Sequence, residues 1–230
     1  MKTSTKIFIA YLFVIASILT LVAGGYFIAT RFGPDLHVKY SPSDLRAYEA
    51  KNGIGAVSGS ATLADLMTGA FREEGGVAFD DYLTQEEITA AVNETSDRDG
   101  MLSDFAIRFH ADGTIEMTFT AGTNFKPIYA FIPEVGNIGP YLRMATGCRI
   151  YYKFAPVLLE DGTFEAESLK TQLGLFEVQI NQTVETMTLA GTAVNRAIRD
   201  LPALRIDEFE VLEGRIHVRG ILPILVRTAS

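Results

Sequence analysis

An uncharged segment near the N-terminus constrains this chain more than any other feature. Residues 7–30 contain no Asp, Glu, Lys, Arg or His. A helix rises about 1.5 Å per residue, so about 20 apolar residues cross the hydrocarbon core of a bilayer. Lys2 and Lys6 precede the segment, and under the positive-inside rule they favour a cytoplasmic location for residues 1–6. The sequence therefore predicts a transmembrane anchor over residues 7–30 and a single pass through the cell membrane.

A cleaved signal peptide is the alternative interpretation of the same segment. The small residues Ala23, Gly24 and Gly25 offer a cleavage site to a signal peptidase. The apolar run is, however, longer than the usual core of a signal peptide, which spans about 7–15 residues. Both interpretations place the rest of the chain, including its C-terminal domain, in an extracytoplasmic location.

The charge and the cysteine content exclude several classes of protein. The net charge is −8 and the isoelectric point is about 4.9. Two of the 20 basic residues precede the anchor, which leaves 18 basic residues against 28 acidic ones. This balance argues against binding to nucleic acid, because no basic surplus is present to neutralise phosphates. The single cysteine, Cys148, excludes an internal disulfide and a thiolate zinc cluster.

The residues after the anchor divide into two regions. Residues 31–76 are predicted to form a juxtamembrane stalk with short helices, because Gly and Ser are frequent and the apolar periodicity is weak. Residues 77–230 are predicted to form an extracytoplasmic α+β domain. Near its start, Thr84 and Glu87 have the spacing of a capping box, in which each side chain binds the other residue's backbone N–H. This spacing predicts the start of a helix.

Three hairpins and one long helix make up most of the predicted domain. Apolar and polar residues alternate on both sides of three short turns, at Asp112-Gly113, Asp161-Gly162 and Glu213-Gly214. A period of two is typical of strands with one buried face, so we expect an antiparallel sheet. The helix is expected over residues 181–201, with an apolar stripe that includes Val184, Met187 and Val194. We interpret the stripe as the face that packs on the sheet, with a coiled-coil partner as the alternative.

Residues 125–146 are unusually apolar for a segment without a regular pattern. Three prolines and two glycines exclude a long helix, and no alternation supports a strand. Such a segment packs into the core, forms an interface or lines an apolar cavity. Its bulky apolar residues are Ile128, Tyr129, Phe131, Ile132, Ile138, Tyr141 and Leu142. The flanking cations that are candidates to bind a phosphate headgroup are Lys126, Arg143 and Arg149.

The sequence contains none of the common catalytic or metal-binding motifs. HExxH, GxSxG, Walker A and GxGxxG patterns do not occur. His110 and His217 lie out of phase with the apolar faces of their strands, which predicts surface positions. We therefore expect a protein that is not an enzyme and that uses no cofactor or metal ion.

The order of these elements is similar to that of a known bacterial family. The segments LTQEEITAAVN (83–93), DGTIEM (112–117), DGTFE (161–165) and EFEVLEGRIHVRG (208–220) carry the similarity. Over residues 77–222 the chain resembles the YpmS family of bacterial membrane-anchored extracytoplasmic proteins and, more loosely, LmeA-type envelope lipid-binding proteins. The resemblance implies a curved antiparallel sheet packed around one long helix, akin to tubular lipid-binding domains. It also implies an apolar groove lined by loop 125–146 and by Val184, Met187 and Val194.

Two functions are consistent with these features. The first is a membrane-anchored extracytoplasmic module of a bacterial cell envelope that binds or transfers membrane lipids without catalysis. The second is a structural or accessory single-pass subunit of a membrane protein complex, in which the anchor packs against other subunits. The sequence favours the first function, because the anchor, the resemblance and the apolar loop all point to lipid.

Overall fold

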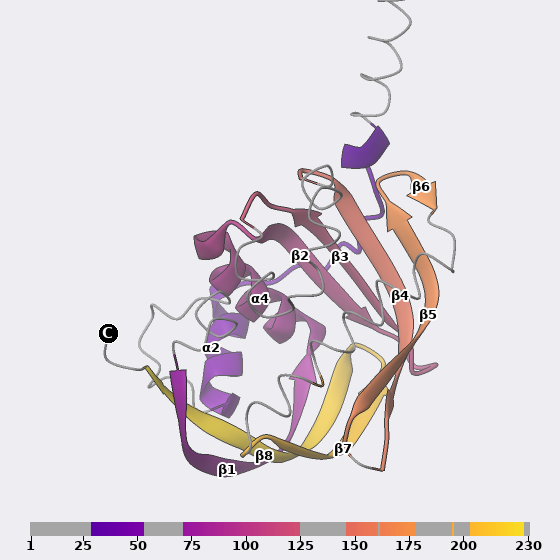
Figure 1. Ribbon diagram of the computed structural model, residues 1–230. Coiled ribbons are helices and arrows are strands. Elements are labelled where there is room, and N and C mark those ends of the chain that lie inside the picture. Colours follow the sequence, from indigo (N-terminus) through magenta and orange to yellow (C-terminus); the bar gives the residue numbers. More distant parts are fainter. Residues whose placement is uncertain are drawn as a thin grey trace, which may run out of the picture.

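The computed structural model describes residues 29–52, 71–124, 146–160, 162–177, 195 and 203–227. The helices in these residues are α2 (Pro42–Asn52) and α4 (Gln85–Asp99), and residues 29–31 are also helical (Figure 1). The strands are β1 (Phe71–Thr84), β2 (Leu102–Phe109), β3 (Ile115–Ala121), β4 (Arg149–Leu158), β5 (Phe164–Leu173), β6 (Phe176–Glu177), β7 (Arg205–Leu212) and β8 (Arg215–Arg227).

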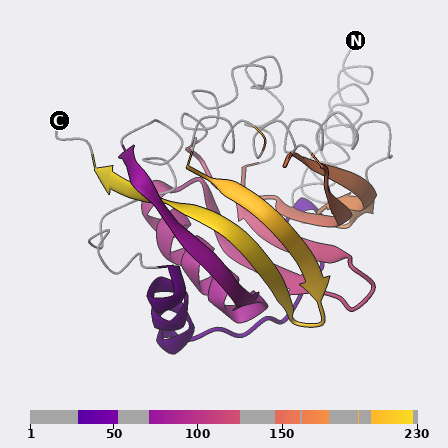
Figure 2. The ribbon, with the colours of Figure 1, turned by 90° about the horizontal axis from the view of Figure 1, so that it is seen from below.

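The strands form two antiparallel sheets (Figure 2). One sheet has the strand order β1-β8-β7, and the other has the order β2-β3-β4-β5-β6. The α+β class is therefore confirmed, and the three predicted hairpins are present as β2–β3, β4–β5 and β7–β8. The expectation of one curved sheet is wrong for the described residues. Strand β1 pairs along its length with β8, and β8 also pairs with β7. These three strands therefore form a sheet of their own beside the five-stranded sheet.

The hydrophobic core lies between the two sheets. Phe109 and Ile115 of the five-stranded sheet are buried with Phe79, Ile216 and Val218 of the three-stranded sheet. Successive side chains of a strand point to opposite faces, so each strand gives alternate residues to this core. The face of each sheet that is directed to the core is called its inner face below, and the opposite face is its outer face.

Helix α4 begins at the predicted capping box. Glu87 N donates to Thr84 Oγ1 at 3.2 Å, and Thr84 N donates to Glu87 Oε2 at 2.9 Å. The Glu87 carboxylate is buried, and its Oε1 lies 2.7 Å from Lys51 Nζ of α2. Lys51 Nζ also donates to Tyr82 O at 2.7 Å. This ion pair therefore fixes α2 against the start of α4 and the end of β1.

Polar side chains of α4 bind the backbone of β2 along the edge that β3 leaves open. Gln85, Thr89 and Asn93 follow one another at intervals of four residues, and their oxygen atoms accept hydrogen bonds of 2.9–3.4 Å. The donors are every second N–H group of β2, at Phe105, Ile107 and Phe109. Four helix residues rise about 6.0 Å and two strand residues rise about 6.7 Å, so the two series stay in step over three pairs. We call this arrangement the side-chain ladder.

Asn195 repeats the arrangement at the start of β5. Its Oδ1 accepts from Phe164 N at 2.8 Å, and its Nδ2 donates to Phe164 O at 3.0 Å. Phe164 in turn packs edge-to-face on Phe209 of β7, with 5.1 Å between the ring centroids. Asn195 belongs to the predicted helix 181–201, whose other residues lie outside the described part of the chain. The packing of that helix on the sheet stays a prediction.

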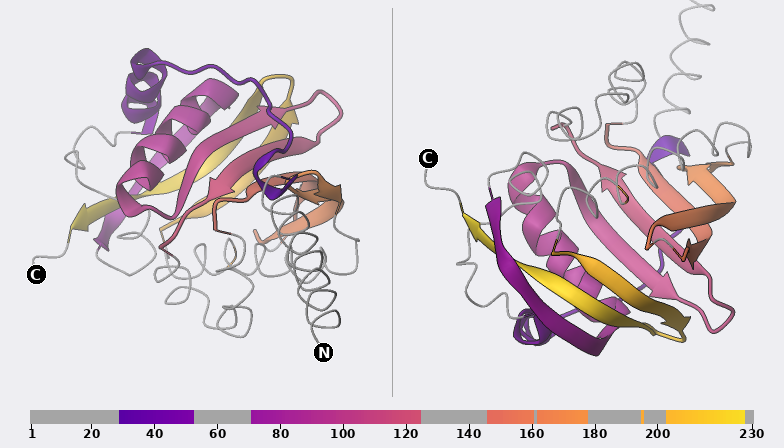
Figure 3. Two further views of the ribbon diagram at one scale, coloured as in Figure 1. Left: turned by 90° about the horizontal axis from the view of Figure 1, so that it is seen from above. Right: turned by 60° about the horizontal axis from the view of Figure 1, so that its bottom comes forward.

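Part of the predicted stalk belongs to the folded domain. The segment that leads into α2 crosses the outer face of the five-stranded sheet (Figure 3). Leu36 is buried there with Ala106 and Tyr151. Strand β1 also begins at Phe71, before the predicted start of the domain at residue 77. A single leucine in a polar segment has no periodic signal, so its burial could not be predicted.

No helix in the described ranges is both long and apolar enough to span a membrane. Residues 7–28 of the predicted anchor lie outside these ranges, so the anchor stays a prediction. The expected long helix enclosed by a sheet also has no counterpart among the described helices, since α4 lies beside the edge of β2.

Candidate functional site

Four segments that are distant in the sequence meet at one end of the domain. We call this end the upper rim, after its place in Figure 1, and it comprises residues 29–33, 121–124, 146–149 and 173–177. Leu175 N donates to Ala29 O at 2.9 Å, and Gly147 N donates to Ala121 O at 2.7 Å. These backbone hydrogen bonds tie the start of the described chain to the β5–β6 turn, and the end of β3 to the approach to β4.

Residues 29 and 30 lie directly against the turn between β5 and β6. Gly174 in this turn has a φ of 61°. A Cβ atom at this position would lie 2.2 Å from Ala29 O and 2.4 Å from Thr30 Cα. Only glycine fits both the left-handed backbone and this close approach. Thr30, where the predicted anchor ends, is itself buried against the domain.

The apolar loop 125–146 begins and ends at the upper rim. The preceding strand β3 ends at Ala121 and the following strand β4 begins at Arg149, and the two strands are neighbours in the sheet. We call the described residues that flank the loop, 121–124 and 146–149, its roots. Ala121 N donates to Cys148 O at 3.0 Å, so the two roots are held together. Residues 125–145 lie outside the described part of the chain. The structure thus shows that both roots lie at the upper rim, which the sequence did not predict.

An apolar strip runs along the inner face of the five-stranded sheet, from the core toward the upper rim. Cross-strand partners share this face, and the half-buried residues of the strip are Met117, Phe119, Ile150, Tyr152 and Leu173. Phe119 and Tyr152 stack with 6.4 Å between the ring centroids. Burial raises the pKa of the Tyr152 hydroxyl to about 12. The strip therefore carries no charge at neutral pH.

Of the predicted site residues, Arg149 alone lies in the described part of the chain. Its side chain is on the outer face, where Nη2 donates to Thr118 Oγ1 at 3.1 Å and lies 3.9 Å from Asp35 Oδ1. The guanidinium is thus directed away from the apolar strip, and its contact with a headgroup stays a prediction. The predicted residues outside the described part are Lys126, Ile128, Tyr129, Phe131, Ile132, Ile138, Tyr141, Leu142, Arg143, Val184, Met187 and Val194.

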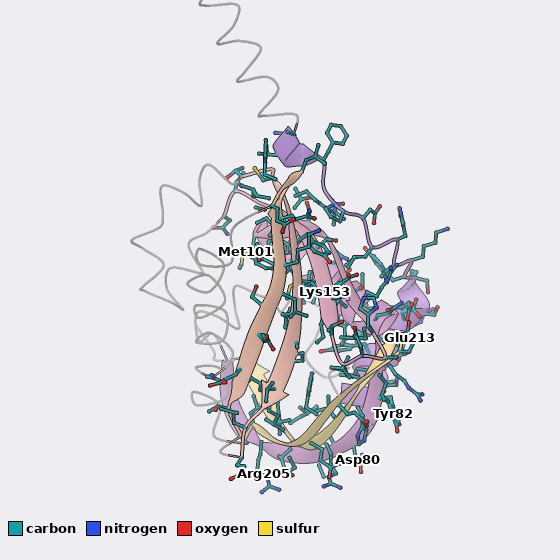
Figure 4. All side chains as sticks on the ribbon, turned by 90° about the vertical axis from the view of Figure 1, so that its right-hand side faces the viewer. Asp80, Tyr82, Met101, Lys153, Arg205 and Glu213 are labelled. Carbon is teal, nitrogen blue, oxygen red and sulfur yellow. The ribbon has the colours of Figure 1, made fainter. Side chains whose placement is uncertain are left out.

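A polar cluster that the sequence did not predict lies on the outer face of the five-stranded sheet. Tyr151 OH donates to Glu116 Oε1 at 2.8 Å. His110 Nε2 lies 3.1 Å from Glu116 Oε2, and Lys153 Nζ, labelled in Figure 4, lies 3.9 Å from Oε1. Desolvation raises the pKa of Glu116, but the Tyr151 hydroxyl and the His110 ring outweigh it and lower the pKa overall. The cluster therefore holds an ionised carboxylate beside the Tyr151 hydroxyl, the His110 ring and the Lys153 ammonium group.

A second polar cluster lies on the outer face of the three-stranded sheet, at the end of the molecule opposite the upper rim (Figure 4). His217 Nε2 lies 2.8 Å from Asp80 Oδ1, and the His217 ring lies 4.9 Å from the Tyr82 ring. Arg215 Cζ lies 4.3 Å from the centroid of the Tyr82 ring. The cross-strand partners of His217 are Tyr82 and Glu210, so neither residue opposite this histidine–carboxylate pair is a serine, threonine or cysteine.

No group of three or more His, Cys, Asp or Glu side chains within the described residues is arranged to hold a metal ion. Cys148, which directly precedes β4, is a buried free cysteine. The chain matches no protein-family model, no curated protein and no solved structure. The similarity to the YpmS family therefore stays a hypothesis from the sequence motifs.

Proposed function

We propose that the protein is a membrane-anchored extracytoplasmic module that binds or transfers lipid in a bacterial cell envelope, without catalysis. The observation that carries the proposal is the place of the roots of loop 125–146. These roots lie at the upper rim, where Ala29 and Thr30 pack against the β5–β6 turn. The predicted anchor ends at Thr30, so the predicted lipid contacts of the loop start at the end of the domain nearest the bilayer.

The apolar strip supports the same proposal. It leads from the upper rim into the domain and presents aromatic and aliphatic side chains without a charge. Lipid sites are mostly apolar with a few polar groups, and an acyl chain is the part of a lipid that such a strip suits. In the implied architecture, helix 181–201 covers the strip and directs Val184, Met187 and Val194 toward it. The two hydrogen bonds between Asn195 and Phe164 support a position of this segment against β5.

Photocrosslinking of the full chain in bacterial membranes tests the proposal. A benzophenone side chain replaces Tyr152 in the apolar strip, and a matched variant carries it at Tyr82 on the outer face of β1. After irradiation we expect an adduct of phospholipid mass on the Tyr152 variant and none on the Tyr82 variant. An adduct of protein mass at Tyr152 would support the accessory-subunit function instead. A folded Tyr152 variant without any adduct would refute a lipid in the strip.

A further inference from the structure

Three apolar side chains are strongly exposed at the upper rim. Phe32 is 62% exposed, Leu175 is 64% exposed and Phe176 is 47% exposed. They belong to two segments that lie side by side, because Leu175 N donates to Ala29 O. Exposed apolar side chains that gather in this way mark an interaction surface. We call these three residues the apolar tip.

The chain that precedes residue 29 indicates what covers the apolar tip. The uncharged segment 7–30 has the length of a membrane span, and its last two residues are the first that the structure describes. When the segment spans the bilayer, Ala29 and Thr30 lie at the boundary between hydrocarbon and headgroups. The hydrogen bond from Leu175 and the close approach at Gly174 hold the β5–β6 turn at the same depth. The apolar tip is then level with the lipid headgroups.

The charges beside the apolar tip are consistent with an apolar contact. Lys170 Nζ lies 3.8 Å from Glu177 Oε2, and Arg149 Nη2 lies 3.9 Å from Asp35 Oδ1, so each of these two cations has a carboxylate beside it. The residues after the anchor carry more acidic than basic groups, and anionic lipids repel such a domain. Aromatic and aliphatic side chains, in contrast, partition favourably into the headgroup region. Apolar insertion is therefore the force that brings this end to the membrane.

We infer that the apolar tip is a bilayer seat: Phe32, Leu175 and Phe176 insert into the headgroup region of the extracytoplasmic leaflet. The inference rests on the membrane anchoring in the proposed function and adds a fixed orientation to it. The upper rim faces the lipid, and the polar cluster around His217 and Asp80 points away from it. The domain sits on its own anchor without a flexible stalk, because residues 29 and 30 are packed against the β5–β6 turn.

Fluorescence quenching of the full chain in vesicles tests the seat. In a Cys148→Ala background, a cysteine at Leu175 or at Phe32 carries an environment-sensitive NBD probe. The matched control places the probe at Leu169 of β5, an exposed leucine (40%) on the strand that ends at the upper rim. The vesicles contain phosphatidylethanolamine, phosphatidylglycerol and spin-labelled lipid. We expect a shift of emission to shorter wavelength and quenching by shallow spin labels at Leu175 and Phe32, with a water-like spectrum at Leu169.

A further probe at Leu19 separates the seat from the anchor, because Leu19 lies in the middle of the uncharged segment. Quenching at Leu19 by deep spin labels, together with water-like spectra at Leu175 and Phe32, would overturn the seat and leave the anchor intact. Water-like spectra at all three positions would overturn both. Far-UV circular dichroism of each labelled protein identifies variants that have lost the fold, and the second tip position replaces any that have.

Discussion

Asn93 allows a quantitative test of the side-chain ladder. Its Nδ2 donates to Thr89 O at 2.9 Å and to Phe105 O at 2.8 Å, and its Oδ1 accepts from Phe105 N at 2.9 Å. Asn93→Ala removes these bonds and leaves two backbone groups of Phe105 without their partner. A buried group without a partner costs about 1–3 kcal/mol, and the half-buried position of Phe105 favours the lower part of that range. We expect a loss of about 2–4 kcal/mol, against a total stability of about 5–15 kcal/mol for a domain.

Urea unfolding of the full chain in detergent, followed by far-UV circular dichroism, measures this loss. Thr95→Ala is the matched control on the same helix, since the Thr95 hydroxyl bonds to Ala91 O and Val92 O of its own helix at 2.9 and 3.0 Å. We expect this control to change the free energy of unfolding by about 0.5 kcal/mol or less. Equal unfolding free energies for Asn93→Ala and Thr95→Ala would refute the idea that the helix supports the edge of β2.

Two other substitutions test the outer face and the upper rim. The lowered pKa of Glu116 stabilises the fold above the ordinary value of 4.5, and this contribution is lost as the pH falls through the lower folded value. Tyr151→Phe weakens the lowering of the Glu116 pKa, so the urea midpoint should fall less on acidification than in the parent protein. An equal fall of the midpoint in the two proteins would contradict this. Gly174→Ala and Gly113→Ala both place a side chain at positive φ, which costs about 1–2 kcal/mol, but only Gly174 faces Ala29, since the space at Gly113 is open. The Gly174 variant should therefore lose about 1–3 kcal/mol more in thermal unfolding, and equal losses would argue against contact between residue 29 and the turn.

Local patterns predicted the local elements of the fold. The spacing of Thr84 and Glu87 placed the start of α4, because both partners of a capping box lie within one helical turn. The Gly113 and Gly214 turns placed two hairpins for a similar reason, since a tight turn brings its own flanking strands together. The pairing of β1 with β8 could not be predicted in this way. Alternation along a strand defines which side chains are buried, but not which distant strand lies beside it.

The residue types of the candidate site could be predicted from the sequence, but the tertiary contacts that bring them together could not. The apolar character of loop 125–146 is visible in the sequence, whereas the contact of Gly174 with Ala29 depends on the tertiary structure. Leu175 follows a glycine without any periodic pattern, so nothing local indicates its exposure. The cluster around Glu116 likewise requires the register of β3 against β4, which sets Glu116 opposite Lys153.

The side-chain ladder also decides how the five-stranded sheet can meet other polypeptides. An open strand edge is a template for β-augmentation by a peptide and for stacking into aggregates. At β2, the N–H groups that an incoming strand would need are already bonded to Gln85, Thr89 and Asn93. A peptide can add to this edge only after α4 has moved, and that movement also breaks the ion pair between Lys51 and the buried carboxylate of Glu87. A partner that meets the five-stranded sheet at β2 must therefore recognise side chains, because the backbone N–H groups of this edge are already bonded to α4.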